Sequence, residues 1–200
     1  MGKKDKEEKT NVMRVLDSKK IEYTSHSYEP DATMTGEEIA ALLGENPDKV
    51  FKTLVTQAKS GQYYVFVIPV QCELDLKKAA KAAGEKAISM IKQKDLLPLT
   101  GYVHGGCSPV GMKKHFPTFI HETAEGFEKM YVSAGKVGFQ VELSPADLIN
   151  ASSGVYEDIV VRDEYTLEAN AVNIGISDYE SGDVVNGEAS IKKLREKHGL

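Results

Sequence analysis

Val50-Phe51-Lys52-Thr53-Leu54-Val55-Thr56 and Tyr63-Tyr64-Val65-Phe66-Val67-Ile68 have the strongest strand patterns in this 200-residue chain. Both are rich in β-branched and aromatic residues, which favour strands. Lys59-Ser60-Gly61-Gln62 between them is typical of a hairpin turn. The second stretch is apolar throughout, so we expect a central strand buried on both faces. The sheet should therefore be built around this hairpin.

Helices and further strands flank the hairpin on both sides. Thr35-Gly36-Glu37-Glu38 has the pattern of a capping box, and the helix that it opens should end at Gly44. Ser144-Pro145-Ala146-Asp147 is a second helix start, with Ser144 as the N-cap. The remaining patterns predict helices over residues 10–20, 75–83 and 91–97, and strands over residues 21–28, 117–121, 128–133, 139–143 and 156–161. This mixed order predicts an α+β fold in which helices surround a mixed, barrel-like, mostly antiparallel sheet.

The C-terminal part of the chain has a different composition. Residues 162–200 contain no proline and few large apolar residues, and residues 157–188 hold nine acidic residues and one arginine. We therefore predict a main domain over residues 1–161 and an acidic C-terminal extension over residues 162–200. Within the extension, residues 171–176 suit a strand and residues 189–197 suit a short helix.

Composition excludes several classes of protein. No apolar run is long enough to span a membrane, and the charged N-terminus lacks the apolar core of a secretory signal. Two cysteines, Cys72 and Cys107, suit a reducing cytoplasm, and the scattered histidines predict neither a metal site nor a cofactor. The net charge of −5 argues against a general nucleic-acid binder. Residues 51–100, with eight lysines and four acidic residues, still allow a local basic face that could meet phosphates.

Residues 101–114 form a second informative stretch, because they contain four glycines, a proline, a serine and two lysines. Paired Gly105 and Gly106 let backbone N–H groups turn toward a ligand, which is how loops bind anions or oxyanions. The alternative is an ordinary turn. The spacing fits neither a phosphate loop nor a dinucleotide motif.

One lysine, one serine and one cysteine are the first candidates for a catalytic or ligand-binding role. Strand alternation puts Lys52 on one face with Leu54, so its ammonium either reaches solvent from a sheet edge or points into a pocket. Ser108 has no nucleophile-elbow pattern around it, so we interpret it as a hydroxyl that binds a ligand or a turn. Cys107 is interpreted as a small buried residue.

Two tyrosines and one aspartate are weaker candidates. Tyr28 and Tyr102 could line a pocket or belong to the core. Asp147 could act as an acid or base, although its place in the first turn of a helix already accounts for it.

The chain resembles the YbaK/EbsC family of aminoacyl-tRNA editing proteins. The resemblance rests on five strings in family order over roughly residues 10–161, namely Val50-Phe51-Lys52-Thr53-Leu54, Leu76-Lys77-Lys78-Ala79-Ala80-Lys81, residues 100–111, Tyr131-Val132-Ser133-Ala134-Gly135-Lys136 and residues 141–148. It implies deacylation of mischarged Cys-tRNA(Pro), with aminoacyl-tRNA as substrate and prolyl-tRNA synthetase as a candidate partner. It implies catalytic roles for Lys52, Gly106 and Ser108, and substrate contacts for Tyr28, Thr53, Tyr102, Gly105, Ser133 and Asp147.

The family mechanism needs no protein nucleophile, since the thiol of the substrate cysteine attacks its own ester and yields a cyclic thiolactone. The protein then supplies positioning and oxyanion stabilisation. Two alternatives stay open. The substrate could carry another small amino acid, as in Ala-tRNA(Pro), or the chain could be a non-catalytic module that binds tRNA or the synthetase.

Overall fold

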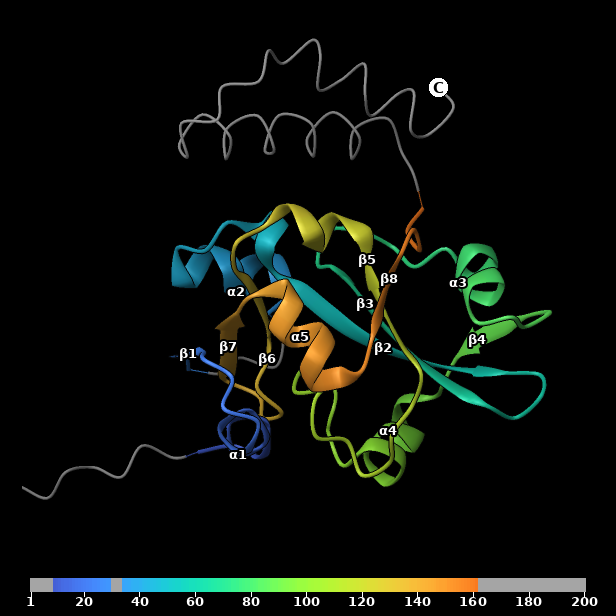
Figure 1. Cartoon of the computed structure of the whole chain (residues 1–200), viewed down its shortest axis with the longest axis horizontal. Coiled ribbons are helices and arrows are strands. Elements are labelled where there is room, and N and C mark those ends of the chain that lie inside the picture. The colour runs from blue at the N-terminus through green and yellow to red at the C-terminus, as the bar shows by residue number, and fades with distance from the viewer. Residues whose placement is uncertain (1–8, 30–33, 162–200) are drawn as a thin grey trace, which may run out of the picture. The chain divides into compact units, whose positions relative to one another are not determined.

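The computed structural model describes residues 9–29 and 34–161 (Figure 1). The helices are α1 (Asn11–Ser18), α2 (Gly36–Leu43), α3 (Leu76–Ala82), α4 (Gln93–Thr100) and α5 (Pro145–Ser152), with short 3-10 helices η1 (Pro47–Lys49) and η2 (Glu122–Gly126). The strands are β1 (Thr24–Ser27), β2 (Phe51–Ala58), β3 (Tyr63–Pro69), β4 (Ile88–Met90), β5 (Thr118–His121), β6 (Met130–Ser133), β7 (Phe139–Leu143) and β8 (Val155–Glu157). The strand and helix predicted within residues 162–200 lie outside the described residues.

The described strands form two sheets around the predicted hairpin. The larger has the order β4-β2-β3-β5-β8 and the smaller the order β1-β7-β6. β2 and β3 pair antiparallel from Phe51 opposite Pro69 to Gln57 opposite Tyr63, while β5 runs parallel to both β3 and β8. An isolated bridge between Val50 and Tyr131 links the start of β2 to β6. The α+β class, the hairpin and the central position of β3 are thus confirmed.

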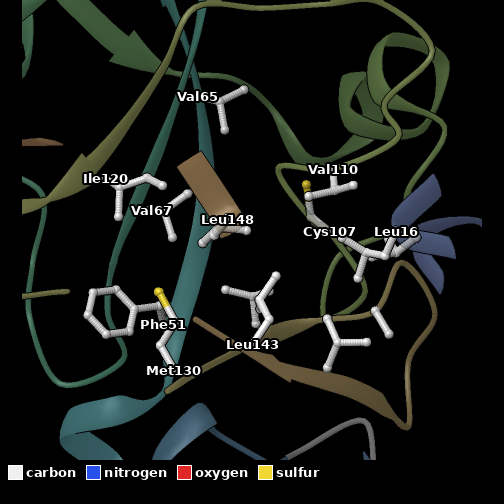
Figure 2. Close-up of a cluster of buried hydrophobic side chains, with 14 of the residues drawn as sticks. Leu16, Phe51, Val65, Val67, Cys107, Val110, Ile120, Met130, Leu143 and Leu148 are labelled. Atoms are coloured by element: carbon white, nitrogen blue, oxygen red, sulfur yellow. The ribbon is translucent and has the colours of Figure 1, made fainter. Parts of the chain in front are cut away.

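The core lies on both faces of the larger sheet. Figure 2 shows one side, where Val65 and Val67 of β3 pack with Phe51 of β2 and with residues of the smaller sheet and α5. The alternate β3 residues, Phe66 and Ile68, belong to a second buried cluster beneath α3. Both faces of β3 are therefore apolar because both are buried.

The helix caps agree with the sequence patterns. Thr35 and Glu38 form the reciprocal capping box of α2, and Gly44 ends the helix in the left-handed conformation. Ser144 caps α5 with Pro145 in its first turn. No helix within residues 9–29 and 34–161 has the length and apolarity needed to cross a bilayer.

One helix differs from the prediction, because α4 continues past Pro98 to Thr100. A proline removes one helical N–H donor. The missing donor is the one that would bond the Lys94 carbonyl, while the last turn keeps the Thr100 hydroxyl bond to the Leu96 carbonyl at 2.8 Å and the Gly101 N–H bond to the Leu97 carbonyl at 2.9 Å. Gly101 then ends the helix in the left-handed conformation.

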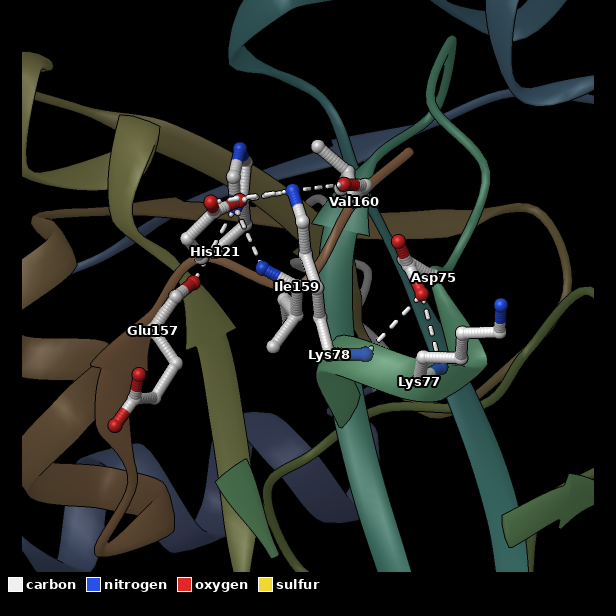
Figure 3. Close-up of polar contacts among 8 residues, drawn as sticks. Asp75, Lys77, Lys78, His121, Glu157, Ile159 and Val160 are labelled. Atoms are coloured by element: carbon white, nitrogen blue, oxygen red, sulfur yellow. Dashed lines mark hydrogen bonds and ion pairs between the residues drawn. The ribbon is translucent and has the colours of Figure 1, made fainter. Parts of the chain in front are cut away.

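The last predicted strand is shorter than expected, because β8 ends at Glu157 and Val160 then forms only an isolated antiparallel bridge with Leu74. Figure 3 shows the side-chain contacts of the residues that follow β8. Lys78 of α3 donates to the Asp158 carboxylate at 3.0 and 3.1 Å and to the Val160 carbonyl at 2.8 Å. The His121 Nδ1 lies 3.3 Å from the Glu157 carbonyl oxygen and 3.5 Å from the Ile159 nitrogen. These polar contacts hold the chain against α3 and β5.

His121 should make stability depend on pH. Its side chain is buried, and burial lowers its pKa below the ordinary value of 6.5. The unfolded chain therefore takes up this proton first as the pH falls, so the contribution of His121 to stability is present above pH 6.5 and is lost below it. We expect the unfolding free energy of the wild type to fall relative to that of His121→Asn between about pH 7 and about pH 5. Parallel profiles from urea denaturation would contradict this assignment.

Candidate functional site

A cavity of about 490 Å³ opens where the start of β2 meets α2, the glycine-rich loop and the smaller sheet. Its walls include Tyr28, Lys52, Thr53, Gly105 and Ser133, which are five of the nine residues predicted to bind or act on substrate. A second cavity of about 640 Å³ lies beside α1 and β1, and none of the nine lines it. Residues far apart in sequence thus meet in the first cavity.

Lys52 points to this cavity and not simply to an open edge. It is half-buried in β2, and its ammonium donates to the Val70 carbonyl at 2.9 Å. Burial lowers the pKa of Lys52, while Cys72, Glu73 and Glu37 act in the opposite direction. Of the two interpretations open from sequence, the pocket one fits the geometry. The cavity therefore carries a cation at one wall.

Two buried hydroxyls lie in the same walls without hydrogen-bond partners. The Oγ1 of Thr53 on β2 and the Oγ of Ser133 on β6 contact no donor or acceptor among the described residues. Buried polar atoms are nearly always paired, and an orphan costs free energy. Both oxygens are covered in this structure, so a ligand in the cavity gains these two partners only when the wall around them shifts.

The glycine-rich loop contributes backbone to the cavity. Gly105 has φ +79°, a conformation that favours glycine, and both Gly105 and Cys107 are lining residues. The N–H groups of these two residues donate to no acceptor among the described residues. The Gly106 N–H is already used, since it donates to the Val103 carbonyl at 3.1 Å. The amides available to a ligand are thus those on either side of Gly106.

The other four predicted residues lie outside the cavity walls and have local partners. The Tyr102 hydroxyl donates to the Val110 carbonyl at 2.7 Å, and the Ser108 hydroxyl accepts from the Val110 N–H at 3.4 Å. Asp147 accepts from the Ser144 hydroxyl at 2.6 Å in the first turn of α5. Gly106 packs against the backbone of residues 136–137. The contacts of these four residues to substrate stay predictions. In the structure, three of them stabilise the glycine-rich loop and Asp147 stabilises the start of α5.

Cys107 is a buried wall residue with an unreactive thiol. Burial raises its pKa to about 12, so the thiolate needed for nucleophilic attack is scarce at neutral pH. This agrees with its interpretation as a small buried residue. Among the described residues, no group of three or more His, Cys, Asp or Glu could hold a metal ion.

Sequence reasoning missed a polar pair at the back of the cavity, Gln140 and Glu45. Gln140 on β7 lines the cavity and is buried. With its amide assigned so that the nitrogen and not the oxygen faces Glu45, it donates to the Glu45 carboxylate at 2.9 and 3.2 Å. Burial raises the pKa of Glu45 to about 7, and the Glu142 carboxylate adds to the rise. Glu45 follows Gly44 at a helix end, where a surface residue is the ordinary expectation, so only the fold reveals its burial.

The fold and the cavity define an α+β domain in which the half-buried Lys52, the loop amides and the hydroxyls of the cavity walls suit an anionic or carbonyl-bearing ligand. The family is shown by sequence: the aminoacyl-tRNA editing domain matches residues 30–151, more than half of the chain, and the chain belongs to that family. EbsC of Enterococcus faecalis, a proposed Cys-tRNA(Pro)/Cys-tRNA(Cys) deacylase, is 42% identical over 164 residues, which are 82% of this chain and 100% of EbsC.

Solved structures show the same fold. The hypothetical protein APE2540 has a TM-score of 0.70 at 25% identity, covering 76% of this chain and 100% of its own. A proposed trans-editing enzyme for prolyl tRNA synthetase has a TM-score of 0.67 at 22% identity, covering 76% of this chain and 96% of its own. The α+β architecture is therefore the architecture of the editing domain.

Proposed function

We propose that this chain is a trans-editing deacylase that removes cysteine from mischarged Cys-tRNA(Pro). The observation that carries the proposal is the cavity of about 490 Å³ whose walls bring together Lys52 with Thr53 and Ser133, two residues whose covered hydroxyls have no partner among the described residues. Membership of the editing-domain family and the likeness to EbsC support the same conclusion. We propose further that residues 1–161 form the acting domain, that it works in the cytoplasm and that prolyl-tRNA synthetase is its partner.

The chemistry starts within the substrate. The sulfur of the cysteinyl group attacks its own ester carbonyl, a C–S bond forms, and the carbonyl oxygen becomes an oxyanion. Collapse of this intermediate breaks the bond to the 3′ oxygen of the tRNA, which takes the thiol proton, and a cyclic thiolactone leaves. No nucleophile from the protein is required, which fits the buried, high-pKa thiol of Cys107.

The protein's part is to position the ester and stabilise its developing charge. We assign the Lys52 ammonium and the N–H groups of Gly105 and Cys107, three residues of the cavity walls, as the donors to the developing oxyanion. Donors fixed before the reaction stabilise an oxyanion without reorganising. Thr53 and Ser133 supply hydroxyls that bind the polar groups of the amino acid or of the terminal ribose.

A panel of aminoacylated tRNA(Pro) molecules tests the proposal. The purified chain should release cysteine from Cys-tRNA(Pro) and leave Ser-tRNA(Pro) intact, because a serine hydroxyl is a poor replacement for the attacking thiol. Release of alanine instead would assign the related activity on Ala-tRNA(Pro). Binding of the charged tRNA with no release above background would replace the enzyme by a non-catalytic module.

The unpaired hydroxyls predict opposite effects on stability and activity. Thr53→Val and Ser133→Ala each remove an orphaned buried oxygen, so the unfolding free energy should stay the same or rise by up to about 1 kcal/mol. Deacylation should fall about tenfold, since the substrate loses a partner. Thr56→Val is the matched control, because Thr56 is also buried in β2 but donates to the Tyr64 carbonyl and lies outside the cavity walls. A destabilised, fully active Thr53→Val would contradict the prediction.

A further inference from the structure

Glu45 and Gln140 form a buried pair at the back of the cavity. Gln140 reaches the cavity from β7, while Glu45 lies in the segment between α2 and η1 and has 8% of its surface exposed. An amide oxygen facing the Glu45 carboxylate would place acceptor against acceptor, so the amide is assigned the other way round; its Nε2 then donates to Glu45 Oε2 at 2.9 Å and to Oε1 at 3.2 Å. Both carboxylate oxygens thus face the same amide nitrogen, so the amide oxygen of Gln140 must point away from Glu45.

The groups around Glu45 are acidic or neutral on each neighbouring element. Glu142 on β7 carries the nearest charge that acts on it, and Tyr28 after β1 and Tyr131 on β6 lie close enough for Glu45 to raise their pKa values. His26 on β1 contacts Glu142 at 3.2 Å and packs edge-on against Tyr131. No lysine or arginine among the described residues acts on Glu45, and its carboxylate is therefore held chiefly by Gln140.

We propose that Glu45 is a positioning residue: in its ionised form it fixes the Gln140 amide so that the carbonyl faces the cavity and accepts a hydrogen bond from the substrate's α-ammonium. This inference rests on the proposed function, because the α-ammonium is the cation that every aminoacyl ester carries. Gln140 is then the residue that contacts the substrate, and Glu45 acts only through it.

Protonation of Glu45 would undo this arrangement. A carboxylic acid can donate its proton to the Gln140 carbonyl, and the amide is then free to turn its NH2 group toward the cavity. An NH2 group cannot accept from an ammonium, so recognition of the amine is lost. Burial and the Glu142 carboxylate raise the pKa of Glu45 to about 7, whereas the bond from Gln140 favours the carboxylate and acts in the opposite direction, so the change falls on the acidic side of neutral pH.

Two non-hydrolysable probes isolate the amine. One is the amide-linked 3′-cysteinylamino-3′-deoxyadenosine, and the other is its 3-mercaptopropionyl counterpart, which lacks only the α-amine. We expect the wild type to prefer the amine-bearing probe about tenfold near pH 7.5, and to lose this preference toward about pH 5.5. The amine deprotonates at higher pH in every variant, so only the acidic limb of the profile reports Glu45.

Glu45→Gln and Glu142→Gln separate the proposal from its rivals. Glu45→Gln keeps an acceptor for the Gln140 nitrogen that does not titrate, so the acidic limb should vanish. Glu142→Gln removes the neighbouring charge, so the limb should remain and shift to lower pH. A limb that survives unchanged in Glu45→Gln overturns the proposal. So does a wild type that binds the two probes equally.

A spectroscopic readout covers the case in which a variant does not fold. The side-chain NH2 resonances of Gln140 in the ¹⁵N-labelled wild type should move with a single midpoint near neutral pH, and resonances that do not move would overturn the proposal. Both readouts use no ester, so they stand apart from the proposed function. If the protein deacylates its substrate but shows no pH-dependent preference, only the proposed role of Glu45 is wrong. If it shows the preference but no deacylation, only the proposed enzymatic function is wrong.

Discussion

Replacing Lys52 by alanine should lower kcat/KM for deacylation by about a hundredfold to a thousandfold, the usual cost of losing one preorganised donor to an oxyanion. The reason is position. Lys52 sits on a strand paired on one side with β3, its ammonium is anchored to the Val70 carbonyl at 2.9 Å, and it is the lysine in the cavity walls. Water that enters the truncated cavity cannot replace a fixed cation.

Stability should change little in the same variant, by about 1 kcal/mol or less, because one hydrogen bond is lost while a half-buried charge is relieved. Lys59→Ala is the matched control, since Lys59 is an exposed lysine in the turn of the same hairpin. It removes an equal charge far from the cavity walls, and its activity should equal that of the wild type. Equal deacylation rates for Lys52→Ala and Lys59→Ala would remove Lys52 from the mechanism.

Gly106→Ala should damage both the loop and the reaction. A Cβ on Gly106 would lie 3.0 Å from the Val137 nitrogen and 3.2 Å from the Lys136 carbonyl carbon, and neither backbone atom can move without moving the turn after β6. We expect a loss of about 1–3 kcal/mol in unfolding free energy from this overpacking. Turnover should fall about tenfold or more, because the amides of Gly105 and Cys107 move with the loop.

Gly61→Ala separates strain from site geometry. Gly61 has φ +90° in the hairpin turn, and a Cβ there would meet no atom within 4 Å. Its substitution should cost about 1 kcal/mol in stability through the backbone conformation alone. Turnover should be unchanged, since Gly61 lies outside the cavity walls. If Gly106→Ala were as active as Gly61→Ala, the loop would have no role in catalysis.

The local elements were predictable because their signals are local. The alternation of β2, the apolar run of β3 and the caps of α2 and α5 depend on residues that are near one another in sequence. The path of α4 past Pro98 was not predicted, because a proline ordinarily ends a helix, whereas here the bonds of Thr100 to Leu96 and of Gly101 to Leu97 hold one more turn. The length of β8 was wrong for a similar reason, since Lys78 of a distant helix holds the residues that follow it.

The candidate site divides in the same way. Three residues predicted from the family resemblance, Lys52, Thr53 and Ser133, line one cavity. It does not reveal that the Gly106 amide is used within its own turn, or that the hydroxyls of Thr53 and Ser133 lack partners. Glu45 shows the limit most plainly. A glutamate beside a helix-ending glycine is ordinarily expected at the surface. Its burial depends on the packing of the segment between α2 and η1 against Gln140 of β7.

The decisive measurement compares the release of amino acid from Cys-tRNA(Pro) and from Ser-tRNA(Pro), by the wild type and by Lys52→Ala. It tests whether this cavity is a deacylase site that depends on the substrate thiol and on Lys52. We predict that the wild type frees cysteine but not serine, and that Lys52→Ala frees cysteine about a hundredfold to a thousandfold more slowly. Equal release of cysteine and serine would contradict the substrate-thiol mechanism. No release of any amino acid by the wild type would contradict the assignment of this cavity as a deacylase site.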